Sequence, residues 1–89
     1  MASPEILRKL EEKHRVCLEE LEEVFARDPV FLRREKDQYG ERRYLALGTT
    51  NSGRYLIAVF TVPEPGKAKV ITARQMSGHE QRLYRSKRK

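Results

Sequence analysis

Tryptophan is absent from this sequence, cysteine occurs once, and apolar residues never run for long. The longest unbroken run of aliphatic and phenylalanine residues covers 56–60, whereas a helix that spans a bilayer needs about 20 apolar residues. The first residues turn acidic without an apolar segment, so we expect no secretory signal. These absences together predict a cytoplasmic protein without a membrane anchor.

Metal-binding residues are equally scarce. Cys17 has no second cysteine with which to form an internal disulfide, and His14 and His79 stand at no spacing typical of a zinc site. The sequence therefore predicts no metal and no cofactor.

Acidic residues are the minority, and the two signs of charge are unevenly distributed. The 89 residues include 19 Lys and Arg against 13 Asp and Glu, a net charge of +6. Residues 1–25 carry a net −3, residues 26–64 a net +2 and residues 65–89 a net +7. A strongly basic end indicates contact with a polyanion.

The length predicts a single domain, 1–89, because a chain this short buries one core only. Its last residues, about 85–89, form a basic tail. For the final three residues alone, solvation of an unstructured tail explains the charge equally well.

Two helices are expected at the N-terminal end. Ser3 and Pro4 are typical of a helix N-cap and first turn, and apolar residues recur at helical spacing through Leu10. The spacing restarts after Cys17 and stops before Pro29, which predicts a second, shorter helix.

β-rich composition follows the two helices. Residues 44–47 and 54–62 flank a glycine-containing loop and predict a hairpin, and residues 68–73 predict a third strand after a turn at 63–66. Residues 30–32 fit a short edge strand that is followed by a charged loop.

The last helix is predicted by a capping box. Ser77 and Glu80 have the spacing at which each side chain accepts a backbone N–H of the other residue, so a basic helix should run from Gly78 to about Ser86. The predicted fold class is therefore α+β, with two N-terminal helices packed on a small antiparallel sheet of three to four strands and a short C-terminal helix.

Four segments resemble the BrnT-type toxin family in order and spacing. They are Lys13-His14-x-Val16 with the acidic helix that ends in Val24-Phe25 and Asp28-Pro29, the strand at 41–48, the strand at 53–61, and residues 71–77 with Glu80 and Tyr84. The resemblance covers about residues 13–84. It implies a RelE-like fold and a bacterial ribonuclease toxin of a type II toxin–antitoxin pair. The implied partners are RNA and a ribbon-helix-helix antitoxin that also binds operator DNA.

Two departures from the family pattern concern the N-terminal half. Family members open with a strand before their first helix, whereas only three residues stand there in this chain, so we expect that strand to be missing. The family glycine after the Lys-His pair is Arg15 here, and the family serine N-cap is Cys17. The turn between the two helices is therefore expected to differ.

Arg54 and Arg74 are the predicted catalytic cations. Arg54 begins one expected strand and Arg74 ends the next, so in an antiparallel pair both side chains lie at the same end of the sheet. Guanidinium groups suit the pentavalent phosphorane of RNA cleavage, because they donate paired hydrogen bonds to phosphate oxygens. The family resemblance points to the same two arginines. The alternative is a solvated strand end or a contact to the acidic first helix.

His14 is the titrating candidate for the base that removes the 2′-hydroxyl proton, because imidazole changes charge near neutral pH. The alternative is a half-buried histidine packed on the sheet, or a cation at a helix C-terminus. His79 is expected to be exposed.

Further residues are expected to contact nucleic acid without taking part in catalysis. They are Arg43, Lys69, Arg82, Tyr84 and Arg85. Tyr84 either stacks on a base or packs on the sheet. The acidic helices are either solvated faces or docking surfaces for a basic antitoxin segment.

The residues and the family resemblance together favour a BrnT-like ribonuclease toxin that cleaves RNA without a metal. The alternative is a non-catalytic module on the same scaffold that binds nucleic acid or another protein. A homodimer is compatible with the small core, although no residue pattern identifies its interface.

Overall fold

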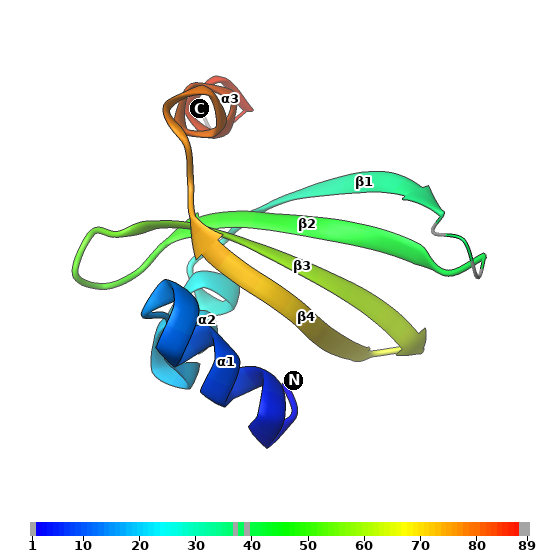
Figure 1. Ribbon diagram of the computed structural model, residues 1–89. Coiled ribbons are helices and arrows are strands. Elements are labelled where there is room, and N and C mark those ends of the chain that lie inside the picture. Colours follow the sequence, from blue (N-terminus) through cyan, green and yellow to red (C-terminus); the bar gives the residue numbers. More distant parts are fainter. Residues whose placement is uncertain (1, 37, 39, 88–89) are drawn as a thin grey trace.

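The computed structural model describes residues 2–36, 38 and 40–87. Its elements follow in the order α1 (Pro4–His14), α2 (Leu18–Ala26), β1 (Val30–Lys36), β2 (Arg42–Thr49), β3 (Tyr55–Glu64), β4 (Lys67–Gln75) and α3 (Gly78–Lys87). The four strands form one antiparallel sheet in the order β1-β2-β3-β4, and Figure 1 shows α1 and α2 on one face and α3 on the other. The predicted α+β class is confirmed.

Helix α1 begins as its sequence predicts, and it ends in a turn that glycine would favour. Ser3 Oγ accepts the backbone N–H of Ile6 at 3.2 Å, and Pro4 occupies the first turn. Arg15 closes the helix with φ 53° and ψ 42°, the left-handed conformation that glycine adopts most easily, and the N–H of Val16 donates to the Leu10 carbonyl. The turn therefore has a glycine-like backbone although an arginine stands in it.

Helix α2 packs very closely on β2. Leu21 and Val24 are buried, and Gly48 of β2 lies directly beneath Val24. A Cβ atom at Gly48 would stand 3.0 Å from Cγ1 of Val24 and 3.5 Å from Cβ of Pro29. Only glycine lets the helix and the strand approach to this distance.

All four strands extend beyond their predicted bounds, and β1 and β3 depart from the prediction most clearly. β1 was expected at 30–32 and extends to Lys36, because Leu32 pairs with Leu45 and Lys36 pairs with Arg42. β3 continues through Pro63, where a turn was expected. Its pairing with β4 is irregular at this point, so Pro63 needs no ladder N–H.

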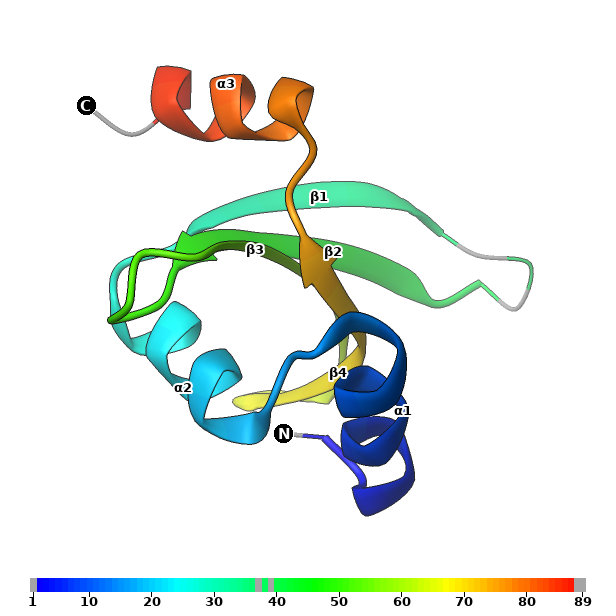
Figure 2. The ribbon, with the colours of Figure 1, turned by 60° about the vertical axis from the view of Figure 1, so that its left-hand side comes forward.

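Two apolar clusters hold the layers together. The larger one lies between the sheet and α1 and α2, and includes Leu10, Leu21, Leu56 and Phe60. The smaller cluster lies on the opposite face beneath α3 and consists of Leu47, Ile57, Met76 and Tyr84. Figure 2 shows the sheet curving around the two N-terminal helices while α3 lies across its outer face.

Within the described part of the chain, none of the helices combines the length and apolar character that crossing a bilayer would require.

Candidate active site

A pocket of about 400 Å³ opens where the C-terminal end of α1 meets the first residues of β3 and the last residues of β4. Its lining is Lys13, His14, Arg15, Arg54, Arg74 and Gln75. Four of these six residues are lysine or arginine, and no carboxylate is among them. The pocket is therefore suited to an anion such as a phosphate group.

Strand register brings the two predicted arginines together. Arg74 pairs with Ile57 and Gln75 pairs with Leu56, so the end of β4 lies beside the start of β3, which Arg54 immediately precedes. Both arginines line the same pocket.

The loop before Arg54 is closed by its own hydrogen bonds. Buried Thr50 accepts the backbone N–H of Arg54 on its Oγ1 at 3.0 Å and donates its own N–H to the Arg54 carbonyl at 2.9 Å. Gly53 supplies a positive φ of 92° within this turn. The backbone at Arg54 is therefore held in one position by local contacts.

Arg54 is anchored to the turn between α1 and α2. Its Nη1 donates to both carboxylate oxygens of Glu20, at 2.9 and 2.7 Å, and to the Arg15 carbonyl at 2.8 Å. Glu20 also accepts the backbone N–H of Cys17. Within the described residues, the guanidinium of Arg54 makes these hydrogen bonds through Nη1 and none through Nε or Nη2.

Arg74 forms a two-pronged ion pair with Glu80 of α3. Its Nη1 and Nη2 donate to the two carboxylate oxygens at 2.7 and 2.8 Å. Glu80 completes the predicted capping box by accepting the Ser77 N–H at 2.8 Å, while Ser77 Oγ accepts the Glu80 N–H. The Arg74 side chain nevertheless remains 49% exposed.

These contacts shift the pKa values of the pair. The hydrogen bonds from Arg74 are the main cause that lowers the pKa of Glu80 from 4.5 to about 2, and desolvation opposes them. The same hydrogen bonds raise the pKa of Arg74 above its ordinary value. The pair is therefore fully ionised in the neutral range.

His14 is the last residue of α1, and its side chain is exposed on the pocket lining. The alternative that His14 is half-buried on the sheet is wrong, because its side chain is exposed. The alternative that placed His14 at a helix C-terminus gave its position correctly. The acidic contacts foreseen for Arg54 and Arg74 do exist, but they come from Glu20 of α2 and Glu80 of α3 rather than from the first helix.

The residues expected to contact nucleic acid lie in different environments. Lys69, Arg82 and Arg85 are exposed, and Arg43 is half-buried. Tyr84 is only 4% exposed and packs edge-to-face on Tyr55, so its ring is not available for stacking on a base. Of the two alternatives for Tyr84, packing on the sheet is confirmed.

Sequence reasoning missed several parts of this site. Lys13 and Arg15 line the pocket because α1 ends beside β4, a packing arrangement without a local sequence signal. The partnership of Glu80 with Arg74 could have been found, because the capping position stands six residues after the arginine across a short connection. His79, beside this cap, is exposed as expected.

Metal-ligand chemistry has no cluster to support it in the described residues, where no three His, Cys, Asp or Glu side chains gather around a common point.

The comparisons with known proteins concern most of the chain. A family model described as the ribonuclease toxin BrnT of type II toxin–antitoxin systems matches residues 7–80, a span that contains every residue of the pocket. No match was found among curated proteins. Because the model spans most of the chain, the protein belongs to the BrnT family of ribonuclease toxins of type II toxin–antitoxin systems.

Proposed function

We propose that this chain cleaves RNA by metal-independent acid/base chemistry in the pocket at the end of the sheet. Arg54 and Arg74 are the cations that stabilise the transition state, and His14 is the base. The observation that carries the proposal is that Arg54, just before β3, Arg74 of β4 and an exposed histidine line one cationic pocket.

The proposed reaction begins at the ribose 2′-hydroxyl. His14 takes the hydroxyl proton, the 2′-oxygen forms a bond to phosphorus, and the bond from phosphorus to the 5′-oxygen breaks. The departing 5′-oxygen takes its proton from water, because the pocket is open to solvent. The products are a 2′,3′-cyclic phosphate and a 5′-hydroxyl.

The two arginines are suited to different parts of the phosphorane. Arg54 has Nε and Nη2 to offer, and its ion pair with Glu20 fixes its direction. Arg74 already uses both terminal nitrogens on Glu80, so a phosphate must share these donors or bind at Nε. We expect the negative charge that develops on the equatorial oxygens of the phosphorane to be stabilised mainly by guanidinium donors that are held in position before the reaction.

Cleavage of a labelled single-stranded RNA tests the proposal. Arg54→Ala and Arg74→Ala should each lower kcat by about 100-fold or more, the typical effect of removing one preorganised donor. They should also restore growth to cells poisoned by the wild type. Arg74→Lys keeps the charge but loses the two-pronged geometry, so it should recover only part of the rate. Arg8→Ala, an exposed position of α1 outside the pocket, is the matched control.

Circular dichroism of each variant separates loss of chemistry from loss of fold, since Arg54 also bridges the α1–α2 turn. A wild-type protein that binds RNA in a salt-sensitive manner but leaves it intact would contradict the proposal. That result would favour the non-catalytic binding module instead.

The antitoxin that the family implies is proposed to be a ribbon-helix-helix protein acting in the cytoplasm. The resemblance of the sequence supports this choice. A pull-down with the product of a neighbouring short gene tests it, and a partner of another fold would contradict it.

A further inference from the structure

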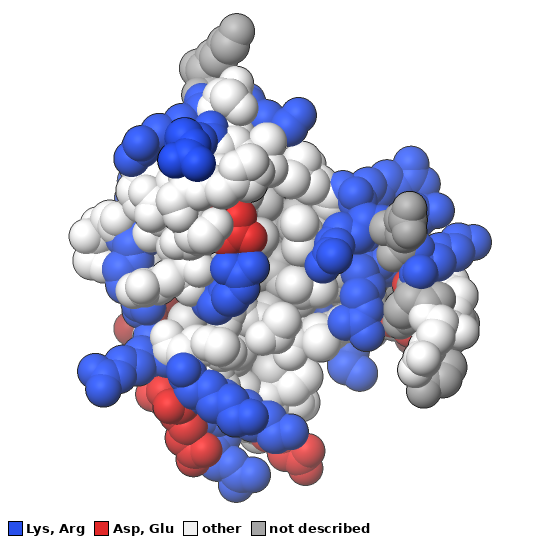
Figure 3. All heavy atoms as spheres, turned by 45° about the horizontal axis from the view of Figure 1, so that its top comes forward, with Lys and Arg blue, Asp and Glu red and all other residues white. Residues whose placement is uncertain are grey.

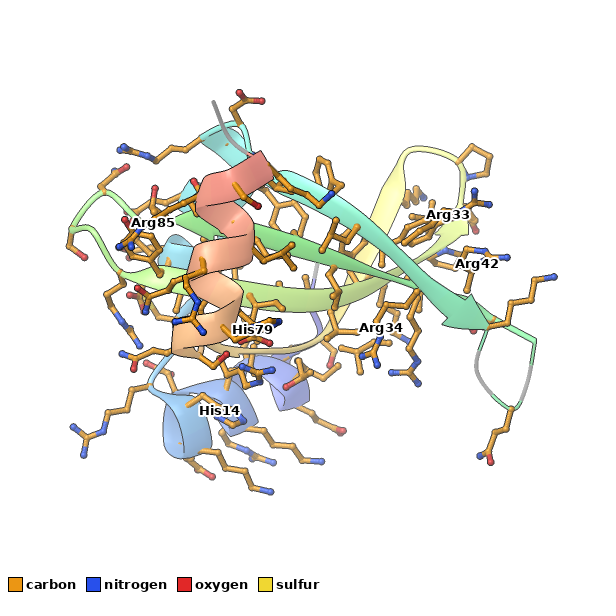
Figure 4. The ribbon with its side chains drawn as sticks, turned by 90° about the horizontal axis from the view of Figure 1, so that it is seen from above. His14, Arg33, Arg34, Arg42, His79 and Arg85 are labelled. Atoms are coloured by element: carbon orange, nitrogen blue, oxygen red, sulfur yellow. The ribbon has the colours of Figure 1, made fainter. Side chains whose placement is uncertain are left out.

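The hairpin of β1 and β2 extends beyond both helical layers and carries a cluster of cations (Figures 1 and 2). We call Arg33, Arg34, Lys36 and Arg42 the basic arm; the first three are exposed and Arg42 is half-buried. Figure 3 shows basic side chains gathered over this hairpin, on the right of the view. Figure 4 shows Arg33, Arg34 and Arg42 near its far end, away from α3.

The arm places like charges next to one another. Lys36 and Arg42 are direct cross-strand partners, an arrangement that disfavours sheet pairing through charge repulsion. Arg42 Nη1 donates to the Arg34 carbonyl at 2.9 Å, which holds one guanidinium across the two strands. Five bases and three acids make the segment 33–43 net positive. A polyanionic partner would relieve this repulsion.

The arm and the pocket lie at opposite ends of the sheet. Arg54 precedes the first residue of β3, whereas Tyr44, the neighbour of the arm in β2, pairs with Phe60, the sixth of the ten residues of β3. At about 3.3 Å per residue, six positions of β3 correspond to roughly 20 Å. The arm therefore cannot hold the phosphate that reacts, but it can hold phosphates several nucleotides away.

An exposed aromatic ring stands beside the arm. Phe31 is 55% exposed and shares a face of β1 with Arg33, two residues further along the strand. Its ring rests against Phe25 and Phe60, with centroid distances of 6.3 and 5.8 Å. Exposed rings interleaved with cations are typical of surfaces that bind single-stranded nucleic acid, because bases stack on the ring.

We propose that the basic arm binds the sugar–phosphate backbone of the single-stranded RNA segment that flanks the cleaved bond, and that Phe31 stacks on one of its bases. This inference rests on the proposed ribonuclease function. RNA is favoured over an acidic protein segment because the cations and the exposed ring together match both chemical parts of a nucleotide.

Binding is measured with a fluorescent single-stranded RNA whose 2′-hydroxyls are methylated, so that it cannot be cleaved. The arm variant is Arg33→Gln/Arg34→Gln, and the matched control is Arg8→Gln/Lys67→Gln, which removes the same charge from exposed positions outside the arm. Losing two phosphate contacts should make the slope of log K against log salt less steep by about 1.4. At 0.1 M salt this loss corresponds to an affinity about 25-fold weaker. The control should retain nearly the wild-type affinity and slope.

The stacking contact has its own variant. Phe31→Leu keeps an apolar side chain against Phe25 and Phe60 but removes the flat ring. It should weaken binding by about fivefold or more and leave the salt slope unchanged, since stacking releases no counterions.

Several outcomes would overturn the inference. The two double variants could weaken binding equally, which would indicate bulk charge alone. The arm variant could bind RNA like the wild type. The arm variant could bind poly-L-glutamate more weakly than the wild type does while its affinity for RNA is unchanged, which would assign the arm to an acidic protein. Cleavage of unmodified RNA by the same preparations separates these results from failure of the proposed function.

Discussion

Arg15 is one of two described residues other than glycine with a positive φ, and Asp28 is the other. Arg15 holds a left-handed backbone that costs a side-chain-bearing residue about 1–2 kcal/mol relative to glycine. Arg54 contacts this position through its backbone, because Nη1 of Arg54 donates to the Arg15 carbonyl oxygen at 2.8 Å. The backbone strain and the side-chain charge at Arg15 are therefore separable by substitution.

Arg15→Gly should raise the free energy of unfolding by about 1 kcal/mol, because the strain disappears and the Arg54 contact persists. Urea denaturation measures the effect. Arg15→Ala is the control, since it removes the same charge and keeps a Cβ atom in the left-handed region. Equal free energies of unfolding for the glycine and alanine variants would contradict the claim that the backbone at Arg15 is strained.

Glu80 is the residue whose ionisation should be visible in stability. Its folded pKa of about 2 lies below its ordinary value of 4.5, so the carboxylate contributes stability above pH 4.5 that is lost as the pH falls toward 2. Glu80→Gln should be less stable than the wild type at neutral pH, and the difference should shrink through this window.

Urea denaturation between pH 2 and 7 checks the Glu80 prediction. Glu64→Gln is the control, because Glu64 forms only a well-exposed pair with Lys67 at 3.5 Å. Its difference from the wild type should stay small throughout. A constant difference between Glu80→Gln and the wild type would show that the ion pair contributes nothing to acid sensitivity.

Elements differ in how far the sequence predicts them. α1 and α3 were predicted closely because Ser3, Ser77 and Glu80 are local capping signals that the structure confirms. β1 was predicted too short because its second half is charged, and only pairing with β2 holds those residues in a strand.

The contacts of the site divide in the same way. Strand order alone predicted that Arg54 and Arg74 lie at one end of the sheet, and they share a pocket. The contact between Arg54 and Glu20 could not be predicted, because it joins residues 34 apart through the packing of α2 on the sheet. The roles of Arg54, Arg74 and His14 in catalysis stay predictions.

The close packing of α2 on β2 gives a test at the level of elements. Gly48→Ala should lower the free energy of unfolding by about 1–3 kcal/mol, because the new methyl group would press on Val24. Gly78→Ala is the control, since a Cβ there meets only the end of the Arg82 side chain at 3.8 Å. Urea midpoints measure both. Equal midpoints for the two variants would mean that α2 shifts away without cost.

At the scale of the whole molecule, the two signs of charge are divided between different elements. The net-negative N-terminal segment forms α1 and α2, whereas the sheet ends and α3 carry most of the basic residues. A polyanion is therefore attracted to one side of the molecule more than to the other.

Salt should affect RNA binding much more than it affects folding. Three phosphate contacts would give a slope of about −2, so raising NaCl from 50 to 200 mM should weaken binding to single-stranded RNA by about 10- to 20-fold. Fluorescence anisotropy measures the binding, and thermal melting in the same buffers is the control. An affinity that does not change with salt would contradict a binding mode dominated by phosphate contacts.

The use of a backbone oxygen at Arg15 has a consequence for sequence variation. Every amino acid carries a carbonyl, so the anchor of Arg54 depends on the left-handed turn at position 15 and not on a particular side chain. A search of related sequences for a fixed side chain would pass over this contact, because selection can maintain it through the shape of the turn alone. Position 15 can therefore accept any residue that tolerates the left-handed turn, while the guanidinium of Arg54 keeps its anchor.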